Sequence, residues 1–267
     1  MKKLTIVSWV VAFVFVSSAS ADNKSNQAEV AKELANPNTA FASLNIKLQY
    51  NDGYQGGGDN FTTVFQPSLP FPLENGDKVL FRPAISYIDN DFSENDKSGF
   101  SDISFDLAYA PNRSDNSIFA IGMIASLPTG SDEFSAKQLA IGPEVLFGKV
   151  SAERVVGIFP NHLVGVAGSG IDDGRVNKTS AQVFWTELLD QGWTMGSAPT
   201  FSYDWESDQA EIPINFSITK TSILGGRPWK VGIEANYYVE KAESTRPDFM
   251  IGFNITPVVE NKLTALF

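Results

Sequence analysis

The feature that most constrains this chain is an alternation of apolar and polar residues that recurs from Phe41 onward. Leu44, Ile46 and Leu48, for example, alternate with polar residues such as Asn45 and Lys47. Because successive side chains of a strand point to opposite faces, each such segment predicts a strand with one apolar face. The clearest segments are 41–50, 61–73, 101–110, 212–219 and 229–240, and weaker ones lie near 79–88, 118–128, 139–149, 155–166, 179–188, 193–205 and 247–257. The pattern predicts an all-β fold of about twelve strands.

Two features favour a transmembrane, antiparallel, up-and-down barrel over a soluble sandwich. Longer polar connections (51–60, 89–99, 129–137, 167–178, 206–210, 241–246) take turns with tighter ones (74–77, 111–117, 150–154, 189–192, 223–228), as in outer-membrane barrels. Aromatic residues fall at the strand ends on the apolar face, where two interfacial girdles would lie. The girdle candidates are Tyr50, Phe61, Phe71, Tyr87, Tyr109, Trp193, Tyr203, Trp205, Trp229 and Tyr237. In the alternative, a sandwich, the same rings would be ordinary core residues.

The first 21 residues predict a secretory signal peptide rather than part of the fold. Lys2 and Lys3 precede an apolar run over 4–16, and Ala19-Ser20-Ala21 is a small-residue cleavage site. The apolar run is too short for a membrane anchor, which needs about 20 residues. We therefore expect a signal peptide over 1–21, an N-terminal segment over 22–40 and a barrel over 41–267.

A short helix is expected before the barrel, within 25–38. Its apolar residues recur at helical spacing, Asn26 and Glu29 match a capping box, and Pro37 disfavours helix beyond Ala35. Two interpretations stay open for residues 22–40: a plug or gate at the inner mouth, or a frayed periplasmic tail.

Prolines are the main difficulty for a barrel, because proline lacks the N–H that a ladder needs and a closed barrel has no edge. The prolines within the proposed strands are Pro67, Pro70, Pro72, Pro83, Pro143, Pro160, Pro199 and Pro213. We expect several β-bulges at these positions.

The inward positions carry charged side chains, which must face water or pair with one another. These lumen candidates are Lys47, Arg82, Asp102, Asp106, Glu144, Asp204, Lys230, Glu234 and Glu240. One interpretation is a polar path that favours cations, and the other is an ion-pair network that fills a closed lumen. A barrel of twelve strands is intermediate in size, so strand number does not choose between them.

Composition excludes several functions. The chain has no cysteine and a single histidine, His162, which excludes thiolate and clustered-histidine metal sites. A formal charge of −11 argues against nucleic-acid binding. We expect no metal, no cofactor and no enzymatic activity, since no serine or paired-carboxylate arrangement singles out a catalytic site. The acidic loops around Asp89, Asp132 and Asp172 are expected to be solvated surface rather than cation sites.

Several segments resemble a family of Gram-negative outer-membrane proteins described as transporters and loosely grouped with proteins of the meta pathway of phenol degradation. The similar segments are FQPSLPFPL (65–73), FRPAI (81–85), DISFDLAYAP (102–111), SYDWESDQAEIPINF (202–216), PWKVGIEANYYVE (228–240) and MIGFNITPVV (250–259). The resemblance implies an outer-membrane barrel that passes small compounds, aromatic ones among them. It assigns no functional residue.

Together these observations predict an outer-membrane channel that passes small solutes by passive diffusion. The alternatives are a closed structural barrel and a secreted soluble β-protein that binds a ligand. The expected partners are outer-membrane lipid, lipopolysaccharide, a small solute and, because the chain ends in Phe267, the barrel assembly machinery.

Overall fold

The computed structural model describes residues 21–92, 96–170, 174–242 and 246–261. The expected signal peptide, apart from Ala21, lies outside these residues, as do the loop acids Glu94, Asp172 and Asp173 and the terminal Phe267. Within the described part of the chain, no helix is both long and apolar enough to cross a membrane.

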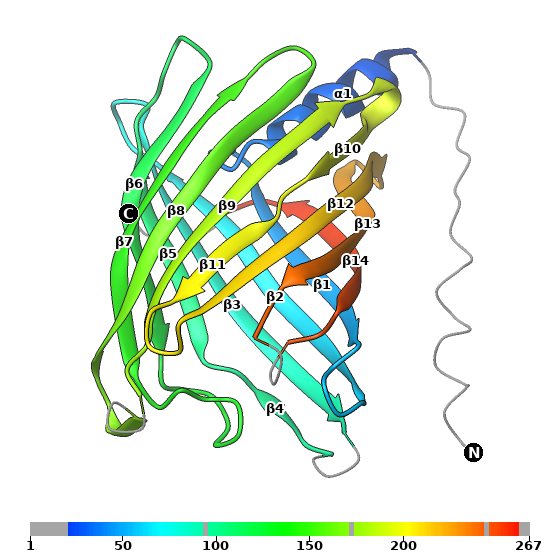
Figure 1. Cartoon of the computed structure of the whole chain (residues 1–267). Helices are drawn as coiled ribbons and strands as arrows, with labels where there is room; N and C mark the ends of the chain where they lie inside the picture. Colours follow the sequence, from blue (N-terminus) through cyan, green and yellow to red (C-terminus); the bar gives the residue numbers. More distant parts are fainter. Residues whose placement is uncertain (1–20, 93–95, 171–173, 243–245, 262–267) are drawn as a thin grey trace.

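The strands form one closed antiparallel barrel (Figure 1). Their bounds are β1 (Ala42–Asp52), β2 (Asp59–Pro72), β3 (Lys78–Asp91), β4 (Ser98–Phe100), β5 (Ile103–Ala110), β6 (Ser117–Leu127), β7 (Leu139–Val150), β8 (Arg154–Ala167), β9 (Asn177–Leu188), β10 (Trp193–Ser197), β11 (Thr200–Asp204), β12 (Gln209–Leu224), β13 (Arg227–Glu240) and β14 (Phe249–Val259). The short β4 pairs with β3, as β5 does, so β4 and β5 together occupy one strand position in the barrel. Strands β10 and β11 both lie between β9 and β12 and likewise share one strand position. Closure comes from the pairing of β14 with both β13 and β1. The predicted twelve-stranded barrel is confirmed.

The two ends of the barrel differ in their connections, as the sequence predicted. Tight turns close one end, for example Gly225 and Gly226 between β12 and β13. Both glycines have positive φ, of 59° and 75°, which a two-residue hairpin of type I′ requires. The longer connections lie at the opposite end (Figure 1). We call the tight-turn end the inner end and the long-loop end the outer end.

Alternation places apolar side chains outside the barrel and polar ones within it, apart from a buried apolar cluster at the inner end. On β12, Ile214 and Phe216 are 62% and 51% exposed, whereas Asn215 between them is buried. On β13 and β14, Ile233 and Ile251 are likewise exposed. An apolar surface of this kind, distributed around a closed sheet, is what a lipid-facing wall requires.

Of the several bulges expected at the prolines, the described strands show one, at Pro213, where the register shifts between Ile212 and Pro213. The prediction of several bulges is wrong, because Pro70, Pro72, Pro143 and Pro160 stay in paired positions without a register shift. Pro199 instead interrupts the segment 193–205, which was expected to be a single strand, and divides it into β10 and β11. Pro67 and Pro83 lie opposite each other in a gap of the β2–β3 ladder, between the pairs Phe65–Ile85 and Leu69–Phe81. Because neither proline has an N–H to donate, one gap accommodates both.

Helix α1 (Ala21–Ala35) lies at the inner end of the barrel (Figure 1). It ends at the predicted residue but begins earlier than Asn26, so the predicted capping box is wrong. The helix contacts the 3₁₀ helix η3 (Asp190–Gly192) and strands β8, β9, β10, β12 and β13. Val30 and Ala31 are buried in these contacts.

Candidate functional site: the barrel lumen

The largest cavity described here, of about 420 Å³, opens at the outer end of the lumen. We call it the outer vestibule. Its lining combines amide and hydroxyl side chains with four aromatic rings: Tyr54, Phe92, Phe134 and Tyr238. Tyr54 and Phe92 pack edge to face, with 5.0 Å between their ring centroids. Burial raises the pKa of Tyr54 to about 12, and the nearby Arg246 guanidinium opposes this rise, so the hydroxyl stays neutral at physiological pH.

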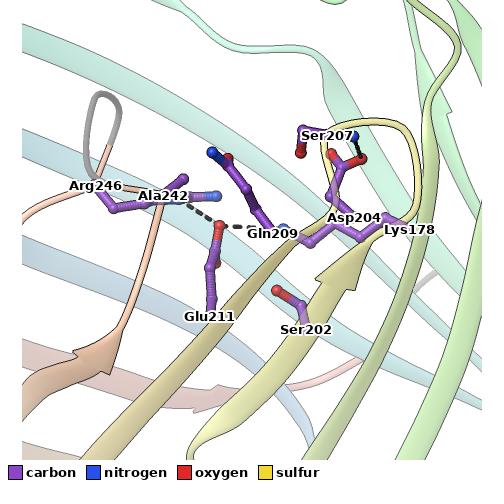
Figure 2. A pocket seen from close by; sticks show the side chains of 8 residues that line it. All are labelled: Lys178, Ser202, Asp204, Ser207, Gln209, Glu211, Ala242 and Arg246. Carbon is purple, nitrogen blue, oxygen red and sulfur yellow. Dashed lines mark hydrogen bonds and ion pairs between the residues drawn. The ribbon is translucent and has the colours of Figure 1, made fainter.

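A second outer cavity, of about 350 Å³, contains an ion-pair cluster of three residues (Figure 2). Glu211 on β12 accepts from Arg246 Nε at 2.7 Å and from Lys178 Nζ on β9 at 3.5 Å. Asp204 lines the same cavity, and its carboxylate accepts from the backbone N–H groups of Glu206 and Ser207. Arg246 also lines the outer vestibule, so the two outer cavities meet at its side chain.

A third cavity, of about 240 Å³, lies between the walls of the barrel further inward. It shares Lys178 and Glu211 with the second cavity and Gln49 and Tyr238 with the outer vestibule. We call it the middle cavity. The shared lining makes the three cavities neighbours along one side of the lumen.

Glu234 reaches into the middle cavity from β13, lying over Gly252 of β14. A Cβ at position 252 would stand 2.8 Å from Glu234 Cγ, which is closer than side-chain contacts allow. On the far side of Gly252, Gln49 Nε2 donates to Glu234 Oε1 at 3.4 Å. The glycine therefore lets the carboxylate lie flat against the wall.

The inner end of the lumen is packed along strands β3 to β9, whereas a cavity of about 200 Å³ remains between α1 and strands β1, β2, β13 and β14. A buried apolar cluster consists of seven residues from β3, β5, β6, β7 and β8 together with Phe184 of β9. Ala35 and Phe159 pack against this cluster. The members on strands β3 to β8 are Leu80, Ala108, Ala110, Ile118, Ala120, Leu146 and Val155. The cavity beside this cluster measures only about 10 Å³ and is lined in part by Pro37, which follows α1.

Charged residues line the same inner region. Arg82 pairs with Asp106 at 2.8 Å and lies 4.8 Å above the centre of the Phe159 ring. Glu144, beside this pair, is 1% exposed, and neither of its carboxylate oxygens receives a hydrogen bond from the described residues. These side chains line the cavity of about 10 Å³, and Arg82 also lines the cavity of about 200 Å³ beside α1.

The N-terminal segment is held in this packed end by lysines of the barrel. Lys230 Nζ donates to the Leu34 carbonyl at 3.0 Å, and Lys78 Nζ donates to the Asn38 carbonyl at 2.7 Å. The first bond places a cation at the carboxyl end of α1, where carbonyls lack helical partners and the dipole favours positive charge. Within the segment, Glu33 accepts from Thr39 Oγ1 and the Ala40 N–H, at 2.9 and 2.6 Å.

Seven of the nine lumen candidates line these cavities or the adjoining one beside α1. They are Lys47, Arg82, Asp106, Glu144, Asp204, Lys230 and Glu234. Asp102 instead accepts from the Gly130 and Ala136 N–H groups and so holds the loop after β6. Glu240 is exposed at the outer end of β13 and lines none of these cavities.

Three charged lining residues escaped the sequence analysis: Lys178, Glu211 and Arg246. Lys178 and Glu211 obey the strand alternation, which could have identified them, but Arg246 lies in a loop, where no periodicity applies. With these included, and without Asp102 and Glu240, the lining carries five basic and five acidic residues. The balance gives no support to the interpretation of a path that favours cations.

The girdle candidates lie toward the strand ends. Tyr50, Phe61, Tyr87, Tyr109, Trp193, Trp205 and Tyr237 are exposed, and Phe71, Tyr203 and Trp229 are partly buried. His162, the only histidine, has its Nδ1 2.8 Å from Thr179 Oγ1, which also accepts from Trp205 Nε1. Its hydrogen-bonded neighbour is thus a threonine and not a serine nucleophile.

Comparison with solved structures identifies the class of fold. An outer membrane channel from Pseudomonas putida F1 superposes with a TM-score of 0.63, at 12% identity, over 82% of this chain and 96% of that one. The NanC porin superposes with a TM-score of 0.54, at 13% identity, over 81% of this chain and 99% of that one. Outer membrane phospholipase A from Escherichia coli scores 0.48, at 8% identity, over 82% and 90% of the two chains.

The chain therefore has the barrel fold found in outer membrane channels and porins. No family model matches the sequence, and neither does any curated protein. The expected grouping with the meta-pathway proteins stays a prediction.

Proposed function

We propose that this protein is a channel of the Gram-negative outer membrane, through which small solutes, small aromatic compounds among them, diffuse passively. One observation carries the proposal: a closed barrel with an apolar exterior encloses neighbouring polar cavities of about 420, 350 and 240 Å³. A wall that is apolar outside and polar inside suits a water-filled path across lipid. The similarity in fold to outer membrane channels supports the same location.

The proposal includes export and insertion. Residues 1–21 would be removed as a signal peptide, the assembly machinery would insert the barrel, and lipid and lipopolysaccharide would surround it. The exposed aromatic residues near the strand ends support this placement, since amphipathic rings prefer membrane–water boundaries. The four rings of the outer vestibule support aromatic solutes, because rings pack favourably edge to face.

Residues 22–40 would act as a plug of the inner mouth. This assignment rests on α1, on Pro37 beside the packed cluster, and on the bonds from Lys230 and Lys78. The tight inner end also favours a second candidate function, a closed structural barrel that passes no solute.

Conductance in planar bilayers separates the two candidates. The purified mature chain should give discrete channel events in potassium chloride, and proteoliposomes should admit arabinose, glycine and simple aromatic compounds faster than empty liposomes do. Absence of both conductance and solute entry, from protein that migrates as a heat-modifiable folded barrel, would favour the structural role. A mature chain that is monomeric without detergent would contradict both candidates.

A further inference from the structure

The outer vestibule contains one charged side chain among its lining residues, Arg246. The other polar groups there are neutral amides and hydroxyls. Three of the amides, on β1, β2 and β3, bond to one another: Asn51 Nδ2 donates to Asn60 Oδ1 at 3.0 Å, and Asn60 Nδ2 donates to Asn90 Oδ1 at 2.6 Å. An anion entering this vestibule therefore meets a positive group and no carboxylate in the lining.

The charge of Arg246 is only partly compensated. Its Nε donates to Glu211, but Glu211 also pairs with Lys178, so two cations share one carboxylate. Within the described residues, the guanidinium is paired through Nε alone, and its two terminal nitrogens stay available. Those nitrogens can bind a carboxylate through two parallel hydrogen bonds, which a lysine cannot do.

The apolar part of the vestibule lining combines four aromatic rings with aliphatic side chains such as Val64, Ile88 and Met250. Tyr54 and Phe92 form an edge-to-face pair, and Phe134 and Tyr238 complete the rings of the lining. Arg246 and these rings line the same cavity. The site thus joins a planar cation to ring surfaces in a cavity large enough for a small ligand.

We infer that the outer vestibule is a binding site for small aromatic carboxylates, with the ring between the aromatic side chains and the carboxylate on Arg246. The inference rests on the proposed function and narrows its solutes to one chemical class. A neutral aromatic compound would leave the guanidinium unused, and an aliphatic carboxylate would leave the rings unused. Only a ligand with both parts uses the whole site.

Binding of benzoate to the full mature barrel in detergent, measured by calorimetric titration, tests this inference without any need for conduction. Benzamide and acetate are the matched ligands, because each lacks one of the two features. We expect benzoate to bind at least about tenfold more tightly than either.

Three variants identify the responsible group. Arg246→Gln should weaken benzoate binding about ten- to hundredfold, the range for a lost charged hydrogen bond, and leave benzamide unaffected. Glu211→Gln should retain or strengthen benzoate binding, because it frees Arg246, whereas a purely structural role of the ion pair would make both variants lose binding. Arg113→Gln is the control, since Arg113 lies over the Phe119 ring outside the vestibule, in the turn after β5.

The outcomes separate this inference from the channel proposal. Arabinose entry into liposomes together with equal binding of benzoate and benzamide would overturn the aromatic carboxylate site and keep the channel. Unchanged benzoate binding in Arg246→Gln, or no benzoate binding by the folded wild type, would also overturn the aromatic carboxylate site. Selective benzoate binding by a barrel that passes nothing would keep the site and remove the channel.

Discussion

The outer and inner halves of the lumen are built from the same strands but are filled differently. The outer half contains cavities of about 420 and 350 Å³, whereas the inner half contains a smaller cavity of about 200 Å³ beside α1 and one of about 10 Å³ beside a buried apolar cluster. Strand number and alternation are the same in both halves. Charged side chains line both halves, so the difference arises from the apolar cluster and the N-terminal segment that fill much of the inner half.

Removal of residues 22–40 is expected to have the largest effect on the difference in filling between the outer and inner halves of the lumen. Without this segment, Lys230 and Lys78 lose their carbonyl partners and, if the proposed plug is right, the inner mouth gains water, so single-channel conductance should rise several-fold. Planar-bilayer recordings of the truncated and full mature chains give the comparison. Lys230→Met, which removes one of the two bonds, should produce a smaller rise, and equal conductance of all three proteins would contradict the plug.

A smaller, local change tests the packing of the inner half. Leu146→Ala should lower the free energy of unfolding by about 2–5 kcal/mol, because Leu146 is 2% exposed within the apolar cluster. Val64→Ala, in the lining of the outer vestibule, should cost clearly less, since Val64 is only partly buried. Urea titration in lipid vesicles measures both variants. Equal losses would show that the two halves are equally well packed.

The middle cavity, between the two halves, should set ion selectivity. Glu234→Lys replaces a lining carboxylate with a cation and should shift the reversal potential in a potassium chloride gradient toward chloride. Glu240→Lys makes the same change outside these cavities and serves as the control. A similar shift in both variants would place Glu234 off the conducting path.

Gly252→Ala should have a milder effect on the same cavity. The added methyl group would push the Glu234 carboxylate away from Gln49 and toward the middle of the lumen, which should strengthen cation preference and lower conductance. The double variant Gly252→Ala/Glu234→Gln should lose the change in selectivity. Persistence of that change without the carboxylate would show that the methyl group acts through the backbone.

The smallest effect is expected at an inner turn. Hydrogen bonds from the Tyr109 hydroxyl and the Asn112 N–H hold the pKa of Asp77 below its usual value. A carboxyl group whose pKa is depressed by folding contributes stability above its unfolded pKa, roughly pH 4, and that contribution is lost as the pH falls through the folded value. Asp77→Asn should therefore destabilise the barrel slightly at pH 7 and make no difference at low pH. Tyr109→Phe should reproduce part of this effect, and an effect independent of pH would contradict the ionic origin.

Much of the wall of this barrel could be predicted from the sequence. The inward or outward position of a residue such as Lys47, Glu234 or Ile214 follows from parity within one strand, which is a local property. The tight turns and the end of α1 before Pro37 are local as well. The start of α1 and the break at Pro199 were missed, because tertiary contacts and ladder geometry decide them.

The sequence by itself determined a closed antiparallel barrel with an apolar exterior and a polar, charged interior. Only the tertiary structure decided which charges meet, as in the cluster of Lys178, Glu211 and Arg246, and where the N-terminal segment lies. The physical reason is that alternation specifies the face of a strand, whereas contacts between side chains depend on the relative register of different strands and on loop conformations that have no period. Side chains on opposite walls become neighbours only after the last strand has paired with the first.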